Sequence, residues 1–471
     1  MTTFGTAPDA SLPLPTVLVT ALSDRFGPRL SRGESVRLQH GRDESKFPPA
    51  PPDAVVFVET TEEVAAVVTL CREHRVPVIP YGAGSSAEGH VLAVRGGLCV
   101  DLSGMNRVLA IHPEDQDVTV QAGVTRLQLN RELKGSGLFF SVDPGADATL
   151  GGMAATAASG TNAVRYGTMR ENVRSMSVVC ADGRVVKTGN RARKSAAGYD
   201  LTHLFIGSEG TFGIITELTL RLFPVPEAVA AAVCAFPTVA AAVQTVIQVM
   251  QLGIPVARCE LLDALTLKAV NRYSKTTLSE QPTLFFEFHG STAAVEEQSV
   301  LAGEIAREQG GQDFAWATRP EDRSRLWQAR HDAFFACLQL KPGATPFVTD
   351  VCVPISALAV CIEDTIKDVQ ASSLPMPLFG HVGDGNFHMV LLIDGANPEE
   401  REEAERINEQ VIGRALALGG TCTGEHGVGI GKAKHLVREH GQPAIDLMQV
   451  LKAAIDPDGL FNPGKILPRP A

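Results

Sequence analysis

The stretch that decides the fold is Pro80-Tyr81-Gly82-Ala83-Gly84-Ser85-Ser86. It follows a predicted strand at 54–58, a helix that begins with the capping pair Thr60 and Glu63, and a second strand at 76–80. Glycine allows backbone N–H groups to point at an anion, and serine hydroxyls add further donors. The loop alone is a weak signal, because a tight turn after a strand is the commoner explanation.

Two further loops of the same character lie between short predicted strands. One covers residues 143–152 and continues into 158–162, and the other covers residues 207–216. Three loops rich in glycine, serine and threonine, each next to a strand, predict a binding surface for an extended cofactor that carries phosphate.

The composition predicts a globular chain with more than one domain. The 471 residues, 44% of them hydrophobic and 20% charged, exceed what one ordinary core accommodates. A net charge of -11 argues against a nucleic-acid binder and against an electrostatic anchor to anionic lipid. The nine cysteines occur singly, which favours a reducing compartment. No apolar stretch is long enough to span a membrane and no secretory signal is recognisable, so we expect a cytoplasmic protein.

Two histidines near the C-terminus flank a glycine-rich turn that is predicted to close a β-hairpin. If Val382 pairs with Phe387, then His381 lies directly opposite His388. Opposed residues have Cβ atoms roughly 4.5–5.5 Å apart, which is close enough for two imidazoles to hold one metal ion.

A third ligand of the same kind follows in the segment Gly424-Glu425-His426-Gly427-Val428-Gly429. Two histidines and Glu425 would form a three-ligand site with open positions, which is the catalytic pattern rather than the structural one. Ordinary polar loop residues remain the alternative at this point.

Together these motifs resemble the FAD-binding domain of the vanillyl-alcohol oxidase flavoprotein superfamily. The motifs are PYGAGSS at 80–86, PGADATLGG at 144–152, ASGTNAVRYGT at 158–168 and GSEGTFGIIT at 207–216. Three others, HVGDGNFH at 381–388, TGEHGVGIGK at 423–432 and LFNPGK at 460–465, resemble the FAD-linked 2-hydroxy-acid dehydrogenase branch, and within it the cytochrome-linked D-lactate dehydrogenases. The resemblance extends from about Ala54 to the C-terminus, and residues 1–46 lie outside it.

The resemblance implies an α+β fold with a two-part FAD-binding domain of the p-cresol methylhydroxylase (PCMH) type. It places an N-terminal segment at 1–46, the FAD-binding domain at 47–226, a substrate cap at 227–455 and a C-terminal segment that returns to the flavin at 456–471. In the cap, strands alternate with long helices, which predicts an antiparallel sheet with helices covering one face.

The cofactor residues are implied by the resemblance alone. FAD would contact Pro80, Gly82, Ala83, Gly84, Ser85, Ser86, Pro144, Gly145, Thr149, Gly151, Gly152, Ser159, Gly160, Gly210, Gly213, Ile215 and Asn462. Some members of the superfamily attach FAD to a histidine of the first loop. The first loop of this chain contains none, and His90 lies outside it, so we expect noncovalent FAD.

The catalytic roles also follow from the resemblance. His381, His388 and Glu425 would hold one divalent metal, zinc or manganese. Arg330 would clamp the substrate carboxylate and His426 would accept the hydroxyl proton, with orientation of Glu425 as the alternative role of His426. Related 2-hydroxyglutarate enzymes have a lysine in the strand that corresponds to 347–350, and this chain has none there. That difference favours a short monocarboxylic substrate.

The predicted reaction is therefore oxidation of a D-2-hydroxy acid such as D-lactate, with electrons passed to cytochrome c, a quinone or an electron-transfer flavoprotein. Peripheral attachment at the inner membrane through such an acceptor and a homodimer are both compatible with the sequence. D-2-hydroxyglutarate or glycolate oxidation is the alternative within the branch. A non-flavin metal-dependent oxygenase, or a flavoprotein that acts as a synthase or assembly partner, is the alternative from another class.

Overall fold

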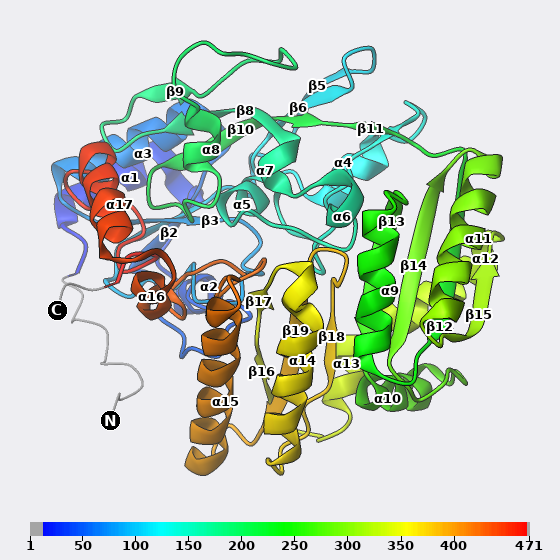
Figure 1. The fold of residues 1–471 in the computed structure, drawn as a ribbon. Coiled ribbons are helices and arrows are strands. Elements are labelled where there is room, and N and C mark those ends of the chain that lie inside the picture. The colour runs from blue at the N-terminus through cyan, green and yellow to red at the C-terminus, as the bar shows by residue number, and fades with distance from the viewer. Residues whose placement is uncertain (1–12, 469–471) are drawn as a thin grey trace. The chain divides into compact units, whose positions relative to one another are not determined.

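A computed structural model describes residues 13–468 of the chain (Figure 1). The chain divides into two compact units. Unit 1 contains residues 13–159, 167–225 and 425–468, and unit 2 contains residues 160–166 and 226–424. Each unit combines helices with β-sheet, so the prediction of an α+β fold with two parts is confirmed.

Unit 1 contains the predicted strand–helix–strand segment. Helix α3 (Thr61–Glu73) joins β2 (Ala54–Phe57) to β3 (Val78–Tyr81), and its N-cap Thr60 accepts a hydrogen bond from the amide of Glu63. Both strands run parallel to β4 (Leu98–Asp101), which lies between them. The segment therefore ends with the loop 80–86 at the carboxyl end of a parallel strand.

The segment before residue 47 belongs to the same sheet and core. Strand β1 (Leu30–Ser31) pairs with β2, and α1 (Thr16–Phe26) buries three apolar side chains against the sheet. At the end of α2 (Glu34–His40), Nε2 of His40 lies 2.7 Å from a carboxylate oxygen of Asp101. The N-terminal segment is thus part of the fold of unit 1 rather than an appendage.

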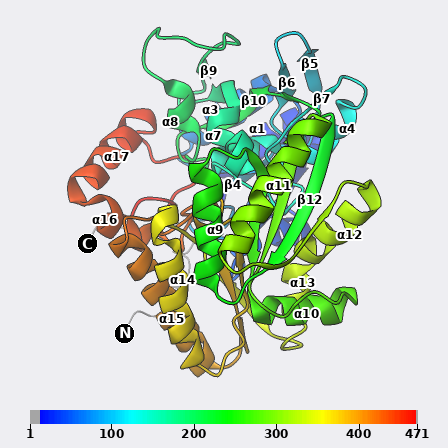
Figure 2. The same cartoon turned by 45° about the vertical axis from the view of Figure 1, so that its right-hand side comes forward.

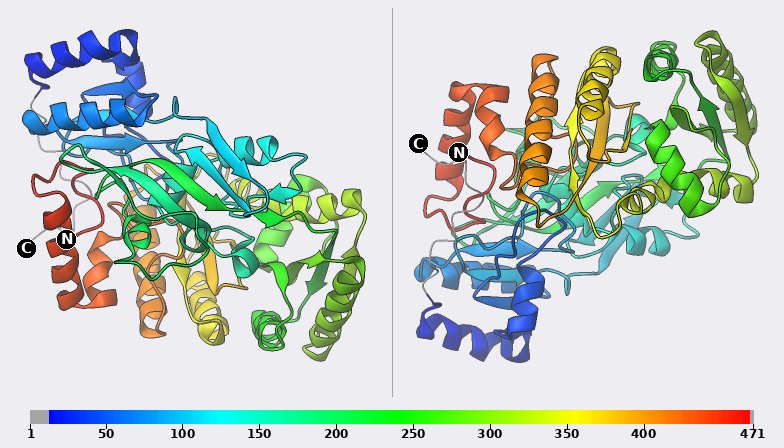
Figure 3. Two further views of the ribbon diagram at one scale, coloured as in Figure 1. Left: turned by 90° about the horizontal axis from the view of Figure 1, so that it is seen from above. Right: turned by 90° about the horizontal axis from the view of Figure 1, so that it is seen from below.

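A second, antiparallel sheet completes unit 1. Its strands follow the order β5 (Val108–His112), β6 (Asp117–Gln121), β10 (Ile214–Arg221), β8 (Val173–Val179) and β9 (Val185–Lys187) (Figure 3). The short strands β7 (Leu138–Phe139) and β11 (Phe223–Pro224) pair separately. The helices are α4 (Arg126–Glu132), α5 (Leu150–Ala155), α7 (Met169–Asn172), α8 (Leu201–Phe205), α16 (Leu436–His440) and α17 (Gln442–Ile455).

Unit 2 is organised around one eight-stranded antiparallel sheet. Its order is β15 (Gln312–Ala317), β12 (Ala228–Ala235), β14 (Thr283–Gly290), β13 (Val256–Leu262), β18 (Leu378–Gly380), β19 (Asn386–Ile393) and β16 (Thr345–Val348), with β17 (Val351–Cys352) also paired to β19. The short helix α6 (Ala163–Tyr166) contacts β13.

Helices cover both faces of this sheet, not the single face that was predicted (Figures 2 and 3). Three of them pack a shared apolar core onto one face, namely α10 (Ala264–Ser274), α12 (Pro320–His331) and α13 (Ala333–Leu338). The opposite face carries α9 (Val239–Gln251), α11 (Thr292–Glu308), α14 (Ile355–Gln370) and α15 (Pro398–Ala417). Among the described residues, no helix combines the length and the apolar composition that crossing a membrane requires.

The histidine hairpin forms, but its predicted register is wrong. Phe379 of β18 pairs with His388 of β19, so His381 lies beyond the end of its strand. There its carbonyl accepts hydrogen bonds from the amides of Asp384 and Asn386 and tightens the turn. A shift of two residues keeps the same face of a strand, which is why the two histidine rings still meet.

The boundary between the units differs from the domain limits that the sequence suggested. Unit 2 ends at Gly424, whereas the limit suggested for the cap was 455, because α17 packs in unit 1, where Lys452 donates hydrogen bonds to the carbonyls of Thr211 and Phe461. Residues 160–166 belong to unit 2.

Candidate functional site

The three small-residue loops meet in unit 1 around one cavity of about 330 Å³. Every cofactor residue predicted from the resemblance lines this cavity except Gly160, which belongs to unit 2. The lining residues are Pro80, Gly82, Ala83, Gly84, Ser85, Ser86, Pro144, Gly145, Thr149, Gly151, Gly152, Ser159, Gly210, Gly213, Ile215 and Asn462, together with His90, Glu209, Glu425 and His426. Segments separated by almost 400 positions therefore share one cavity.

The glycines of these loops are required by close approaches between them. A Cβ on Gly82 would overlap the side chain of Thr149, so the first and second loops could not pack together. Gly210 has a φ of +70°, and a Cβ there would lie 2.9 Å from the ring of Pro80. The narrow, glycine-lined surface that results admits the close backbone approach that a pyrophosphate-bearing cofactor needs.

His90 and Glu209 form a buried pair in the cavity wall. The two residues are 5% exposed each, and Nε2 of His90 lies 3.3 Å from Oε2 of Glu209. Neither ring nitrogen of His90 makes a hydrogen bond among the described residues. Burial alone would lower the pKa of His90, but the charge of Glu209 raises it above its ordinary value. A buried histidine whose Nδ1 makes no hydrogen bond among the described residues, in the wall of a glycine-lined cavity, fits the anionic cofactor FAD.

The C-terminal segment contributes Asn462 to the same wall. The amide of Asn462 donates to the carbonyl of Val78, and its side chain donates to the carbonyls of His90 and Glu209. Nearby, Lys465 is 4% exposed and donates to the carbonyl of Leu92, and burial lowers its pKa to about 7.

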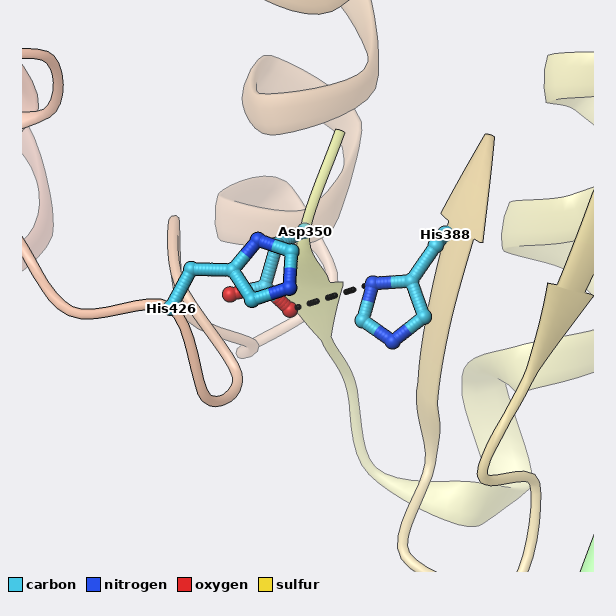
Figure 4. A group of neighbouring side chains, drawn as sticks. All are labelled: Asp350, His388 and His426. Atoms are coloured by element: carbon cyan, nitrogen blue, oxygen red, sulfur yellow. Dashed lines mark ion pairs between the residues drawn. The ribbon is translucent and has the colours of Figure 1, made fainter. Parts of the chain in front are cut away.

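A second polar centre lies in unit 2, at the end of the histidine hairpin. The rings of His381 and His388 are 5.5 Å apart, centroid to centroid, and nearly perpendicular. Nδ1 of His381 donates to Glu260 at 2.7 Å. Nδ1 of His388 lies 3.3 Å from the carbonyl of Thr349 and 3.6 Å from the carboxylate of Asp350 (Figure 4). In the tautomer that donates from Nδ1, each ring carries its lone pair on Nε2.

Glu260 connects the histidine to the predicted carboxylate clamp. It lies on β13 and is completely buried. Its Oε2 accepts a hydrogen bond at 2.8 Å from Nε of Arg330 on α12, and Nη2 of the same guanidinium lies 2.8 Å from that oxygen as an ion pair. Burial alone would raise the pKa of Glu260, but the charges of His381 and Arg330 lower it below its ordinary value. A bidentate pair of this kind fixes the orientation of the guanidinium.

Asp350 is buried as deeply and is held from two sides. Its carboxylate accepts hydrogen bonds at 2.8 Å from the side chains of Asn386 and Thr423. Gly424 packs directly against Asn386, so the last residue of unit 2 lies at this polar centre, and the next residue along the chain is Glu425.

The donor atoms of His381 and His388 are suited to binding a divalent metal ion. Metal-binding histidines commonly donate the other ring N–H to a carboxylate or carbonyl, which fixes the ring and its tautomer, and both histidines do so here. Glu425 is assigned to unit 1, where it and the half-buried His426 line the cavity described above.

Sequence reasoning missed four buried residues of these centres: Glu260, Asp350, His90 and Glu209. Glu209 lies inside the GSEGTFG motif, and Asp350 is the last residue of the predicted strand 347–350, so the charged residue in each of these two segments was the available signal. Glu260 stands in an apolar strand, where a lone carboxylate demands a buried partner.

Comparison with known proteins identifies the family of both parts of the chain. Residues 52–189 match the FAD binding domain family, and residues 225–466 match the C-terminal domain of FAD linked oxidases. The chain is 53% identical over 441 residues to a protein of Danio rerio named probable D-lactate dehydrogenase, mitochondrial, covering 93% of this chain and 89% of that protein. It is 48% identical to D-lactate dehydrogenase [cytochrome], mitochondrial, of Arabidopsis thaliana, covering 97% and 81% of the two chains. Identity to the glycolate oxidase subunit GlcD of Bacillus subtilis is 36%, over 92% and 93%.

Solved structures show the same fold at low identity. One is 4-ethylphenol oxidase from Gulosibacter chungangensis, with a TM-score of 0.79 and 18% identity, covering 98% of this chain and 99% of that one. Another is alkyldihydroxyacetonephosphate synthase, with a TM-score of 0.74 and 21% identity, covering 97% and 86%. The chain therefore belongs to the FAD-linked oxidases, in the branch that contains the D-lactate dehydrogenases and the glycolate oxidase subunits.

Proposed function

We propose that this protein oxidises a short D-2-hydroxy monocarboxylic acid, with D-lactate as the first candidate, to the corresponding 2-oxo acid in an FAD-dependent reaction. The observation that carries the proposal is the buried carboxylate of Glu260, which holds a guanidinium and an imidazole side by side in unit 2. The guanidinium of Arg330 suits the carboxylate of a 2-hydroxy acid, and the imidazole of His381 suits its hydroxyl end. Relatives named D-lactate dehydrogenase support the same substrate.

FAD would be held noncovalently by the three loops and Asn462, which line the cavity of unit 1. When bound, FAD supplies the two-electron oxidant that accepts a hydride from the substrate Cα. The chain contributes the glycine-lined surface, the buried His90 and the C-terminal Asn462 to the cavity wall.

A divalent metal, zinc or manganese, would be held by His381, His388 and Glu425. When bound, such an ion acts as a Lewis acid toward the substrate hydroxyl. Glu260 and the carbonyl of Thr349 support this assignment, because they orient the two imidazoles through Nδ1. Glu425 is the residue bonded to Gly424, which itself packs against Asn386 and Asp350 in unit 2.

Arg330 would bind the substrate carboxylate through its guanidinium, which Glu260 holds by two of its nitrogens. His426 would accept the hydroxyl proton, and proton transfer of this kind contributes about 10²–10⁴-fold. Its place on the wall of the flavin-type cavity supports this role.

The preference for a monocarboxylic acid rests on charge. The strand that would carry a lysine in 2-hydroxyglutarate enzymes leads here to Asp350, a buried carboxylate 3.6 Å from His388. A second substrate carboxylate at this place would meet the like charge of Asp350 instead of a lysine. Glycolate is the second candidate, because a glycolate oxidase subunit is among the relatives.

Electrons would pass from the reduced flavin to a cytochrome, as the names of several relatives suggest.

The proposed reaction is tested by mixing the purified protein anaerobically with D-lactate, D-2-hydroxybutyrate, glycolate and D-2-hydroxyglutarate. The panel is repeated after chelation and after return of Zn²⁺ or Mn²⁺. Flavin bleaching by the short acids, weakened by chelation and restored by the ion, is expected. A colourless protein would favour the metal-dependent oxygenase, and a flavin that no acid bleaches would favour a flavoprotein of another class.

A further inference from the structure

The segment that carries Glu425 and His426 is held in unit 1 by a buried carboxylate, that of Glu209. Glu209 accepts hydrogen bonds from the backbone amides of Val428 at 2.6 Å and of Gly429 at 2.8 Å. Glu209 is 5% exposed, and burial would raise its pKa, but His90 and these two amides lower it below its ordinary value. An ionised carboxylate that receives two amides is a strong, directional anchor.

The segment also lies directly on the pair formed by Glu209 and His90. A Cβ on Gly427 would lie 2.6 Å from Nε2 of His90 and 2.8 Å from Oε1 of Glu209. Gly427 has a φ of +80°, a conformation that favours glycine. The close approach of the backbone thus depends on the absence of a side chain at this position.

Glu209 itself has an unusual backbone conformation. Its φ of +51° is in the left-handed region, which is unfavourable for a non-glycine residue. The conformation is held by its own amide, which donates to the carbonyl of Ala155, and by its carbonyl, which accepts from the side chain of Asn462. Such strain persists where surrounding contacts over-determine it, and it is concentrated at functional sites.

We propose that Glu209 is a positioning residue that fixes the turn 425–429 against the flavin cavity and thereby sets the orientation of Glu425 and His426. The carboxylate belongs to the loop 207–216, so the same loop that lines the cofactor cavity also carries the anchor of the proton acceptor. The catalytic consequence rests on the proposed function, whereas the anchoring does not.

The test compares Glu209→Gln and Gly427→Ala with the wild type, each with FAD bound. Gln keeps one acceptor oxygen and loses the charge and the second acceptor, and Ala at 427 pushes the turn away while Glu209 stays intact. Glu217→Gln is the matched control, because Glu217 lies on the strand β10 that follows the same loop and contacts Ser177 instead of the turn. FAD content, amide hydrogen exchange at 425–430, and anaerobic flavin reduction by saturating D-lactate are measured, with dithionite as a substrate-independent reductant.

Both variants are expected to retain FAD and normal reduction by dithionite, and to exchange the amides of 425–430 about tenfold faster or more. Flavin reduction by saturating D-lactate should slow by roughly 10²-fold, since small misplacements of reacting groups have effects of this size. The control should behave as the wild type. Exchange and reduction within twofold of the wild type in both variants would overturn the proposal. If D-lactate fails to reduce the wild-type flavin, the proposed function fails, and the exchange measurement still decides the anchoring.

Discussion

In unit 2 the buried carboxylate of Glu260 accepts a hydrogen bond from Nδ1 of His381, 2.7 Å away, while it also holds Arg330. One side chain from an apolar strand therefore orients two groups that the proposed reaction uses at opposite ends of a small substrate. A buried charge with two partners is expensive to disturb, because removal of either partner leaves the rest uncompensated.

Glu260→Gln should lower metal affinity and turnover together, each by about 10–100-fold, because the amide cannot accept from His381 and Arg330 at once. Metal content and steady-state kinetics measure the two effects. Glu287→Gln is a suitable control, since Glu287 is a buried carboxylate on the neighbouring strand and contacts His289 at 2.8 Å. Equal losses of metal affinity and turnover in the two variants would contradict the positioning role and show that Glu260 contributes to folding alone.

Arg330→Lys should raise the KM for D-lactate by roughly 10–100-fold. The planar guanidinium of arginine has enough N–H donors to bind the substrate carboxylate and Glu260 at the same time, and an ammonium group cannot reproduce this geometry. Lysine keeps the charge beside Glu260, so the variant should fold. Arg325→Lys on the exposed side of the same helix should leave KM unchanged. An unchanged KM in Arg330→Lys would remove the clamp assignment.

His426→Ala should slow flavin reduction by D-lactate about 10²–10⁴-fold while FAD and metal content stay at wild-type levels. Loss of metal in this variant would instead favour a role in orienting Glu425. Retained turnover with both cofactors bound would exclude the proton-acceptor role.

The pair of His40 and Asp101 predicts a pH-dependent contribution to stability. Burial alone would lower the pKa of His40, but the hydrogen bond to Asp101 raises it above 6.5. A raised pKa in the folded state gives stability that is complete below the unfolded value of about 6.5 and is lost as the pH rises through the folded value. His40→Ala should thus cost about 3–5 kcal/mol at pH 6 and less at pH 8.

Urea denaturation of the holoprotein at the two pH values measures this difference. His203→Ala is the control, since His203 forms an exposed pair with Asp200 and should change the free energy of unfolding by less than about 1 kcal/mol at either pH. A cost for His40→Ala that is the same at pH 6 and pH 8 would contradict the assignment.

Local patterns in the sequence predicted the secondary structure and the cofactor cavity, and the reason is physical. In a loop such as 80–86, glycine permits the backbone conformations that point N–H groups at an anion, and serine adds hydroxyl donors. The ability of such a loop to bind a phosphate group can therefore be recognised from the local sequence, without knowledge of tertiary contacts. The hairpin register was wrong because pairing depends on the strands that flank it. Strand β18 also pairs with β13, and the pairing ends at Gly380.

The residues that hold the site together could not be predicted in the same way. Glu260 meets His381 across 121 positions and Glu209 meets Gly429 across 220, and no spacing rule links residues at such separations. Residues 1–46 were predicted to form a segment separate from the FAD-binding domain for the same reason. Its contacts with the first loop, such as the hydrogen bond from Ser86 to Asp43, arise only in the folded chain.

The most direct test of the proposed function is anaerobic mixing of the FAD-bound protein with D-lactate and, separately, with L-lactate, followed by the flavin spectrum. The proposal predicts rapid bleaching with D-lactate, little with L-lactate, and formation of one pyruvate per flavin reduced. An oxidised flavin spectrum that persists with D-lactate in the metal-loaded protein would contradict it.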